Sequence, residues 1–161
     1  MIDQLIEIIG REAVLFESFL ELLEQQQQML IHDDIDGLNQ VTELQRQKVL
    51  ESQALDGERE QLVVAVREQN DIEGDLNITR LLDLVDDARA ERLTQLRTTV
   101  RDINEKIMEV RNQNANLLNR SREYIQKTMQ MLSRINQPEG NYTPTGVSDP
   151  GRMNVAVDRR A

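Results

Sequence analysis

The chain has 161 residues and a formal net charge of −10; 30% of its residues are charged and only 2% are aromatic. This length suits one domain, and so few aromatic side chains favour a rod of helices over a compact globule, because Leu, Ile and Val fill the narrow seam between paired helices. The acidic balance argues against a general nucleic-acid binder, and the lack of cysteine excludes disulfides, thiol catalysis and cysteine-ligated zinc.

The first predicted helix runs from about residue 2 to residue 31. Its apolar residues recur mostly three and four apart, which is the spacing of helices that pack side by side. These positions are Ile2, Leu5, Ile9, Phe16, Leu20, Leu23 and Leu30. The acidic turn from His32 to Gly37 then offers carboxylates to the free amides of a new helix start. We expect a second helix over about 36–69, and so short a connection makes the two helices antiparallel neighbours.

A second break at residues 70–77 precedes a pattern with no proline or glycine until about residue 135. Its apolar spacing indicates a helix over about 78–135, roughly 87 Å long at about 1.5 Å per residue. The seam passes through Ile78, Leu82, Val85, Leu93, Leu96, Val100, Ile103, Ile107 and Val110, and then through Asn114, Leu117, Ser121, Tyr124, Thr128, Met131 and Ile135. Asp86 and Asp87 also suit a helix start, so a short helix over 78–86 before the long one is an alternative.

The apolar stripe of this last helix widens beyond Val110. Asn114 places an amide in the seam, a device that fixes the register of paired helices at some cost in stability. The widened stripe comprises Leu117, Leu118, Tyr124, Ile125, Met129, Met131 and Leu132. It is either core where all the helices meet or an exposed surface for a partner helix.

Charge is unevenly distributed along the chain. Residues 1–32 carry a net charge of −5, residues 33–77 carry −8, and residues 78–135 carry +3. Since opposite charges beside a seam help to choose helix pairings, we expect the basic last helix to pack within the chain on the acidic ones.

Residues 136–161 are predicted to form a flexible tail, so that the helical rod occupies residues 1–135. All three prolines lie there. Pro138 and Pro144 flank Tyr142 and restrict the local chain, which lowers the entropy lost on docking. Tyr142 is therefore the one plausible anchor of a docking peptide.

No residue set in the sequence supports an enzyme. His32 is the only histidine, and the spacing around Gly37 does not fit a calcium loop. No Glu-x-x-His pair and no glycine-rich phosphate loop are present, so we expect no metal and no cofactor. The start of the chain lacks the features of a signal peptide, and no apolar run approaches the roughly 20 residues of a membrane span. These features predict a cytoplasmic protein that does not insert into a membrane.

The segment from Asn112 to Ile125 carries asparagines, then a leucine pair, then an amphipathic helix. Its order of features resembles the flagellar export chaperones of the FlgN family. In that family a tail with a tyrosine followed by a glycine comes after the helix, and Tyr142 and Gly146 match it.

The rest of the chain is also similar to the family. The acidic turn at residues 33–36, the pair Glu58-Arg59 late in the second helix, and the closing residues 155–161 occur in the family's order. The spacing of apolar residues, the short connection and the proline-containing tail together predict an all-α fold: an antiparallel helical hairpin or coiled-coil bundle with one long carboxy-terminal helix and a disordered tail.

The resemblance further implies a cytosolic chaperone for hook-associated (hook–filament junction) proteins. Such a chaperone holds the client's carboxy-terminal helices, prevents premature assembly and delivers the client to a membrane protein of the export gate, here through Tyr142. The client-binding residues would be Asn114, Leu117, Leu118, Ser121, Tyr124, Ile125, Thr128, Met129 and Leu132. The alternative is a structural coiled-coil protein that self-associates without a client.

Overall fold

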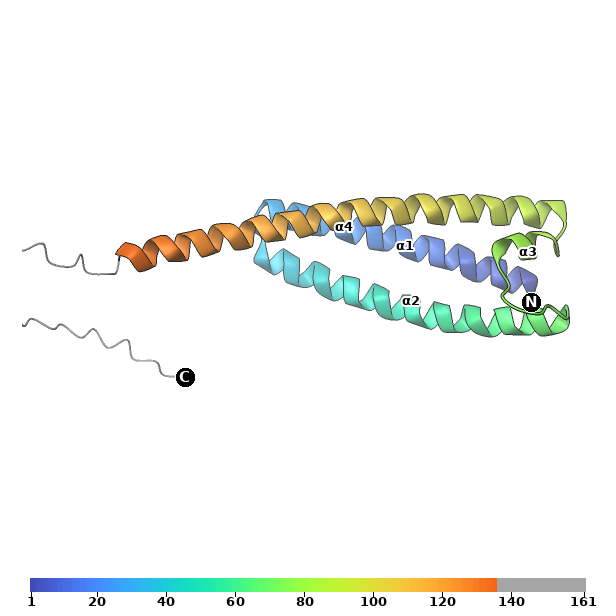
Figure 1. The fold of residues 1–161 in the computed structure, drawn as a ribbon. Coiled ribbons are helices and arrows are strands. Elements are labelled where there is room, and N and C mark those ends of the chain that lie inside the picture. Colours follow the sequence, from blue (N-terminus) through green and yellow to red (C-terminus); the bar gives the residue numbers. More distant parts are fainter. Residues whose placement is uncertain (136–161) are drawn as a thin grey trace, which may run out of the picture. The chain divides into compact units, whose positions relative to one another are not determined.

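The structure, a computed structural model, describes residues 1–135. These residues form four helices and no strand: α1 (Ile2–Ile31), α2 (Ile35–Gln69), α3 (Ile78–Leu82) and α4 (Asp87–Ile135) (Figure 1). The predicted all-α fold with a long carboxy-terminal helix is therefore confirmed. The chain divides into two compact units, Met1–Glu123 and a second that begins at Tyr124. The predicted tail, with Tyr142, lies outside the described residues.

A tight turn joins α1 to α2, which run antiparallel (Figure 1). The Asp34 carboxylate accepts a 2.9 Å hydrogen bond from the Gly37 amide and caps α2, which begins at Ile35, one residue earlier than expected. A Cβ at position 37 would collide with the side chains of Met29 and Asp34, so the turn requires glycine there.

The region between α2 and α4 contains the short helix α3, as in the alternative prediction. The Asn77 side chain caps α3 by accepting a 2.9 Å hydrogen bond from the Arg80 amide. The Asp86 carboxylate accepts a 3.0 Å hydrogen bond from the Arg89 amide, and α4 begins at the next residue, Asp87. The expected single helix over 78–135 is therefore wrong. Two helices form instead, because the Asp86 carboxylate caps a new helix start. The 49 residues of α4 extend for about 74 Å.

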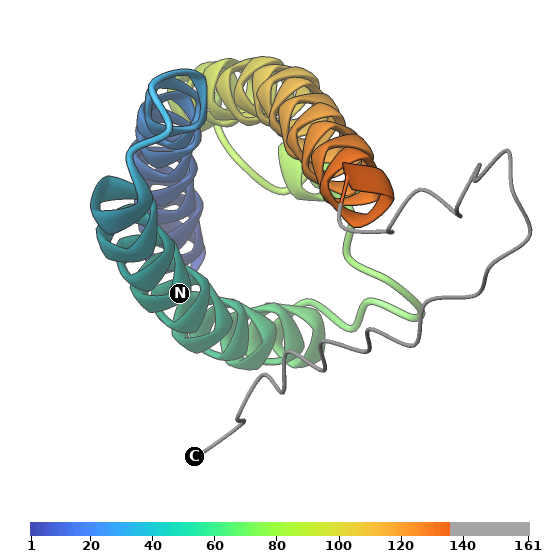
Figure 2. The same ribbon diagram turned by 90° about the vertical axis from the view of Figure 1, so that its left-hand side faces the viewer.

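Helix α1 lies between α2 and α4 (Figure 2) and packs through two rows of residues. The α2-facing row is Leu5, Ile8, Glu12, Leu15, Phe19, Leu22, Gln26 and Met29. The α4-facing row is Ile2, Ile6, Ile9, Ala13, Phe16, Leu20, Leu23, Gln27 and Leu30. Most members of the two rows are buried or half-buried, whereas the remaining faces of α1 are mainly polar and exposed.

Side-chain contacts between the helices assign each row to its neighbour. In the α2-facing row, Glu12 pairs with Arg59 at 2.7 Å. In the α4-facing row, the Gln27 side-chain amide donates a 2.8 Å hydrogen bond to the Gln113 side chain of α4. Within each row the residues alternate at three and four, so each row is the seam of one helix pair.

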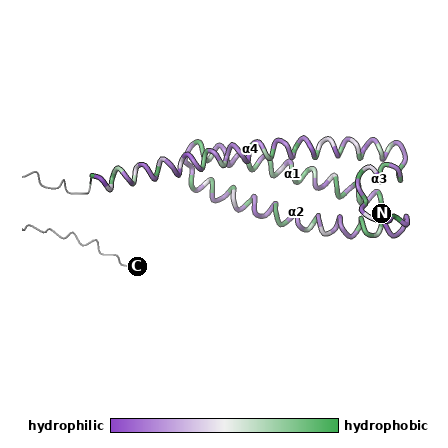
Figure 3. The backbone as a smooth tube through the Cα atoms, viewed as in Figure 1, coloured by the Kyte–Doolittle hydropathy of each residue, from purple (hydrophilic) through white to green (hydrophobic). Residues whose placement is uncertain are grey.

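Helices α2 and α4 each present one such row to α1. Along α2 the row mixes apolar and polar residues, namely Leu38, Val41, Gln45, Lys48, Ser52, Leu55, Arg59, Leu62 and Val66. Along α4 it is apolar from Leu93 through Leu96, Val100, Ile103 and Ile107 to Val110. Hydrophobic residues accordingly recur along the helices between hydrophilic ones (Figure 3). The rows are the physical basis of the fold, because they remove the apolar side of each helix from water.

Helix α3 closes the core near the start of α1. Leu81 of α3 is only 3% exposed and packs in one cluster with Leu5, Ile6 and Leu93. Leu93 is fully buried. A helix of only five residues cannot be stable by itself, so α3 depends on this packing.

Helix α4 runs parallel to α1, since Arg89 near its start bonds to Asp3 near the start of α1. The guanidinium donates to both carboxylate oxygens, at 2.6 and 2.8 Å. This ion pair joins the acidic first helix to the basic last helix, as the charge distribution predicts. The hydrogen bond from Arg89 lowers the pKa of the Asp3 carboxyl below its ordinary value, and its charge adds to the effect.

Arg89→Leu is expected to raise the pKa of Asp3 toward that of an unpaired aspartate. Because folding lowers this pKa, the contribution of the pair to stability is present above about pH 3.9 and is lost as the pH falls through the folded-state pKa. Carbon-13 NMR titration of the Asp3 carboxyl carbon measures the change. Arg46→Leu is the control, since Arg46 pairs with Glu43 within α2. An unchanged Asp3 titration in Arg89→Leu would contradict the assignment.

Candidate partner-binding surface

Asn114 is buried inside the α1–α4 pair, with 3% of its surface exposed. Its side-chain amide donates hydrogen bonds to the Leu23 carbonyl at 2.9 Å and to the Gln26 side chain at 3.1 Å. Its Oδ1 atom is buried and has no donor within the described part of the chain. Asn114 thus forms hydrogen bonds with the chain's own first helix, whereas the residues of the predicted client-binding set after Leu117 are exposed.

Asn114→Leu is expected to raise the free energy of unfolding by about 1 kcal/mol, because an apolar side chain of similar size removes a buried acceptor that lacks a partner. Urea denaturation followed by circular dichroism measures this. Asn116→Leu, on the exposed side of the same helix, should leave the free energy of unfolding nearly unchanged. A net loss of stability in Asn114→Leu would show that the two hydrogen bonds contribute more than desolvation of the amide costs.

The α1–α4 seam ends one helical turn after Asn114. Because α1 and α4 run parallel and Gln27 bonds to Gln113, residues 31 and 117, four positions further on, lie at the same level along this pair. Ile31 is the last residue of α1. Leu117 is correspondingly half-buried, and it is the last residue of α4 with any substantial cover.

Every described side chain after Leu117, from Leu118 to Ile135, is exposed. The large apolar ones are at least half exposed: Leu118, Tyr124, Ile125, Met129, Met131, Leu132 and Ile135. Ser121 and Thr128 lie among them, and the Thr128 hydroxyl donates to the Tyr124 carbonyl at 3.0 Å within the helix. The widened stripe is therefore exposed apolar surface rather than core. Ile135 continues the stripe, and neither Ile135 nor Met131 is in the predicted client-binding set.

The same stretch of α4 is basic. Residues 117–135 carry four basic side chains, Arg120, Arg122, Lys127 and Arg134, and one acidic side chain, Glu123. An exposed apolar stripe with a positive border attracts an amphipathic partner that carries acidic residues.

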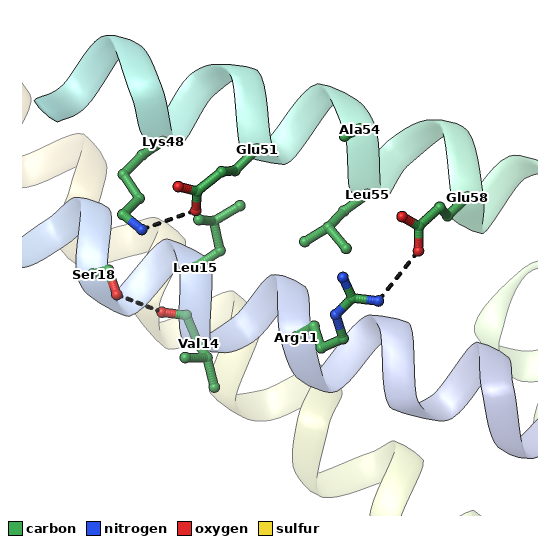
Figure 4. A pocket seen from close by; sticks show the side chains of 9 residues that line it. All are labelled: Arg11, Val14, Leu15, Ser18, Lys48, Glu51, Ala54, Leu55 and Glu58. Carbon is green, nitrogen blue, oxygen red and sulfur yellow. Dashed lines mark hydrogen bonds and ion pairs between the residues drawn. The ribbon is translucent and has the colours of Figure 1, made fainter. Parts of the chain in front are cut away.

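A second surface feature is a groove of about 420 Å³ between α1 and α2 (Figure 4). Leu15 and Leu55 form its floor, and two ion pairs border it, Arg11–Glu58 at 3.2 Å and Lys48–Glu51 at 2.8 Å. The carboxylates are paired with cations, which suits hairpin stabilisation rather than acid–base chemistry.

The described residues contain no group of three or more His, Cys, Asp or Glu side chains placed to hold a metal ion. His32 lies exposed at the end of α1, with its Nδ1 atom 2.8 Å from the Gln28 carbonyl oxygen. Among the helices described, none is both long and apolar enough to cross a membrane.

Fold and surface together define an all-helical protein with an exposed, basic-bordered apolar helix. The family model for the FlgN protein matches residues 1–150, and the chain belongs to this family. FlgN proteins are flagellar export chaperones rather than enzymes. No curated protein and no solved structure was found to match the chain.

Proposed function

We propose that this chaperone works in the cytoplasm and binds the carboxy-terminal helices of hook–filament junction proteins on α4. The observation that carries the proposal is the exposed apolar stripe from Leu117 to Leu132. A free amphipathic client helix would assemble prematurely through its apolar side. Covering that side contributes about 25 cal/mol for each Å² of apolar area buried.

The proposed contact begins at Leu117. Asn114 supports it indirectly, because its hydrogen bonds to α1 fix the register of α4. The flexible methionines Met129 and Met131 adapt to the shape of a partner helix, which suits a surface that serves more than one client.

Delivery to the export gate is assigned to the tail, with Tyr142 as the anchor. This keeps the client-binding and gate-docking residues on different parts of the chain. Release of the client then follows from competition at the gate, and moderate affinity favours it, since ordering a partly unfolded client offsets some of the binding energy.

Replacing Leu118, Ile125 and Met129 together by glutamine is expected to weaken binding of a junction protein's carboxy-terminal segment at least about tenfold, because three apolar contacts are lost. Isothermal titration calorimetry measures the affinity, and circular dichroism checks that the helix persists. The control replaces Asn116 and Gln130, which lie on the side of α4 opposite the stripe, by alanine. If the glutamine variant keeps its helix and binds with unchanged affinity, the stripe is not the surface that binds the junction protein.

Sedimentation velocity separates this function from the self-associating alternative. A chaperone is expected to sediment as one species across protein concentrations and to form a complex with the junction protein. A concentration-dependent oligomer that captures no junction protein would favour a structural coiled coil.

A chain truncated after Ile135 is expected to bind the junction protein with unchanged affinity but to fail in supporting its export. Secretion of the junction protein into the medium measures export. Within the full chain, Tyr142→Ala should reproduce the defect, while Tyr142→Phe should retain most of the export because the ring is kept. Equal export by full-length and truncated chains would contradict the docking role of the tail.

A further inference from the structure

The last part of α4 differs from the first part in carrying two apolar rows instead of one. The first row continues the seam that packs on α1 and comprises Leu117, Ser121, Tyr124, Thr128, Met131 and Ile135. The second row comprises Ala115, Leu118, Arg122, Ile125, Met129 and Leu132. Both rows alternate at three and four, so each has the spacing of a helix seam.

The second row is apolar only in this part of the helix. Earlier in α4 the equivalent positions are Thr94, Arg97, Arg101, Asn104, Met108 and Arg111, which are polar or basic except for Met108. In that part α4 packs on α1 through its one apolar row. The change of character falls where α1 ends, at Ile31, which lies level with Leu117 along the pair.

Helix α1 shows what two such rows do in this protein. After Ile2, each residue of its α4-facing row directly follows a residue of its α2-facing row, as Ile6 follows Leu5 and Leu23 follows Leu22. The second row of α4 follows its first row in the same way, as Ile125 follows Tyr124. Successive residues are about 100° apart around a helix axis, so one neighbouring helix cannot cover both rows. In α1, two helices cover them.

We propose, on the basis of the proposed function, that the carboxy-terminal part of α4 binds two amphipathic helices of its partner side by side, as α1 binds α2 and α4. The chaperone thereby acts as the central helix of a new three-helix assembly. A single bound helix would leave either the first or the second row in water.

Charge specifies the partner further. Arg120, Lys127 and Arg134 each directly precede a first-row residue and form a basic edge along that row. A helix on the first row therefore carries acidic residues along the facing edge. The Arg89–Asp3 ion pair between basic α4 and acidic α1 is the intrachain precedent. A second copy of this chain fits poorly, because antiparallel pairing through first rows would bring two basic edges together.

The test uses a synthetic amphipathic peptide three heptads long, with leucine at its seam positions and glutamate at its edges, titrated into the full-length chain by calorimetry. We expect two peptides to bind per chain. A first-row variant, Tyr124→Glu with Met131→Glu, should bind one peptide. A second-row variant, Ile125→Glu with Leu132→Glu, should also bind one. Combining all four substitutions should abolish binding.

Two controls isolate the rows. Asn116→Glu with Gln130→Glu adds the same charge on the side of α4 opposite both rows and should leave two peptides bound. A peptide with lysine in place of glutamate should bind the unmodified chain at least tenfold more weakly, which tests the basic edge.

A stoichiometry of one peptide that second-row substitution does not change would overturn the two-helix inference while leaving the proposed chaperone function intact. Loss of both peptides in one row's variant and of neither in the other's would also overturn it, since that pattern indicates a peptide dimer on one row. Failure of the junction protein itself to bind, measured as above, would instead overturn the proposed function.

Discussion

The double burial of α1 is the constraint on which the rest of the structure depends. Its α2-facing and α4-facing rows lie one residue apart in sequence, so this one helix packs against a neighbouring helix on each of two sides. Neither α2 nor α4 has a second row within the region that packs on α1, and each therefore depends on α1 for most of its burial. A disruptive substitution in α1 is consequently expected to affect both neighbours, whereas one in α2 leaves the α1–α4 seam in place.

The two seams of α1 differ in chemistry. The α4-facing seam is largely apolar and ends in the amides of Gln27, Gln113 and Asn114. The α2-facing seam includes polar contacts, among them Glu12–Arg59. Polar groups in a seam contribute less net stability than apolar ones but penalise shifted registers, in which they lose their partners. The apolar seam supplies most of the stability, and the polar contacts select one alignment.

Much of the fold could be predicted from residue spacing, because the alternation of three and four marks the apolar side of each helix. The same spacing does not reveal which helix covers that side. Asn114 and Tyr124 both lie in the α4 row, yet Asn114 is buried and Tyr124 is exposed. The difference arises from where α1 ends, which is a tertiary fact. The burial of Leu81 in the core could likewise not be predicted from apolar spacing, since α3 has only five residues and is too short to show a repeating pattern.

The parallel alignment of α1 and α4 has a consequence for the order of folding. The α1–α2 hairpin closes through a tight turn, so its contacts are local and form quickly. The α1–α4 contacts join residues 86 positions apart, as at Asp3 and Arg89 or Gln27 and Gln113. During synthesis the α4-facing row of α1 therefore stays exposed to solvent until α4 has left the ribosome and can pack on it. This flagellar export chaperone therefore passes through a stage at which one apolar row of its own first helix is exposed to water.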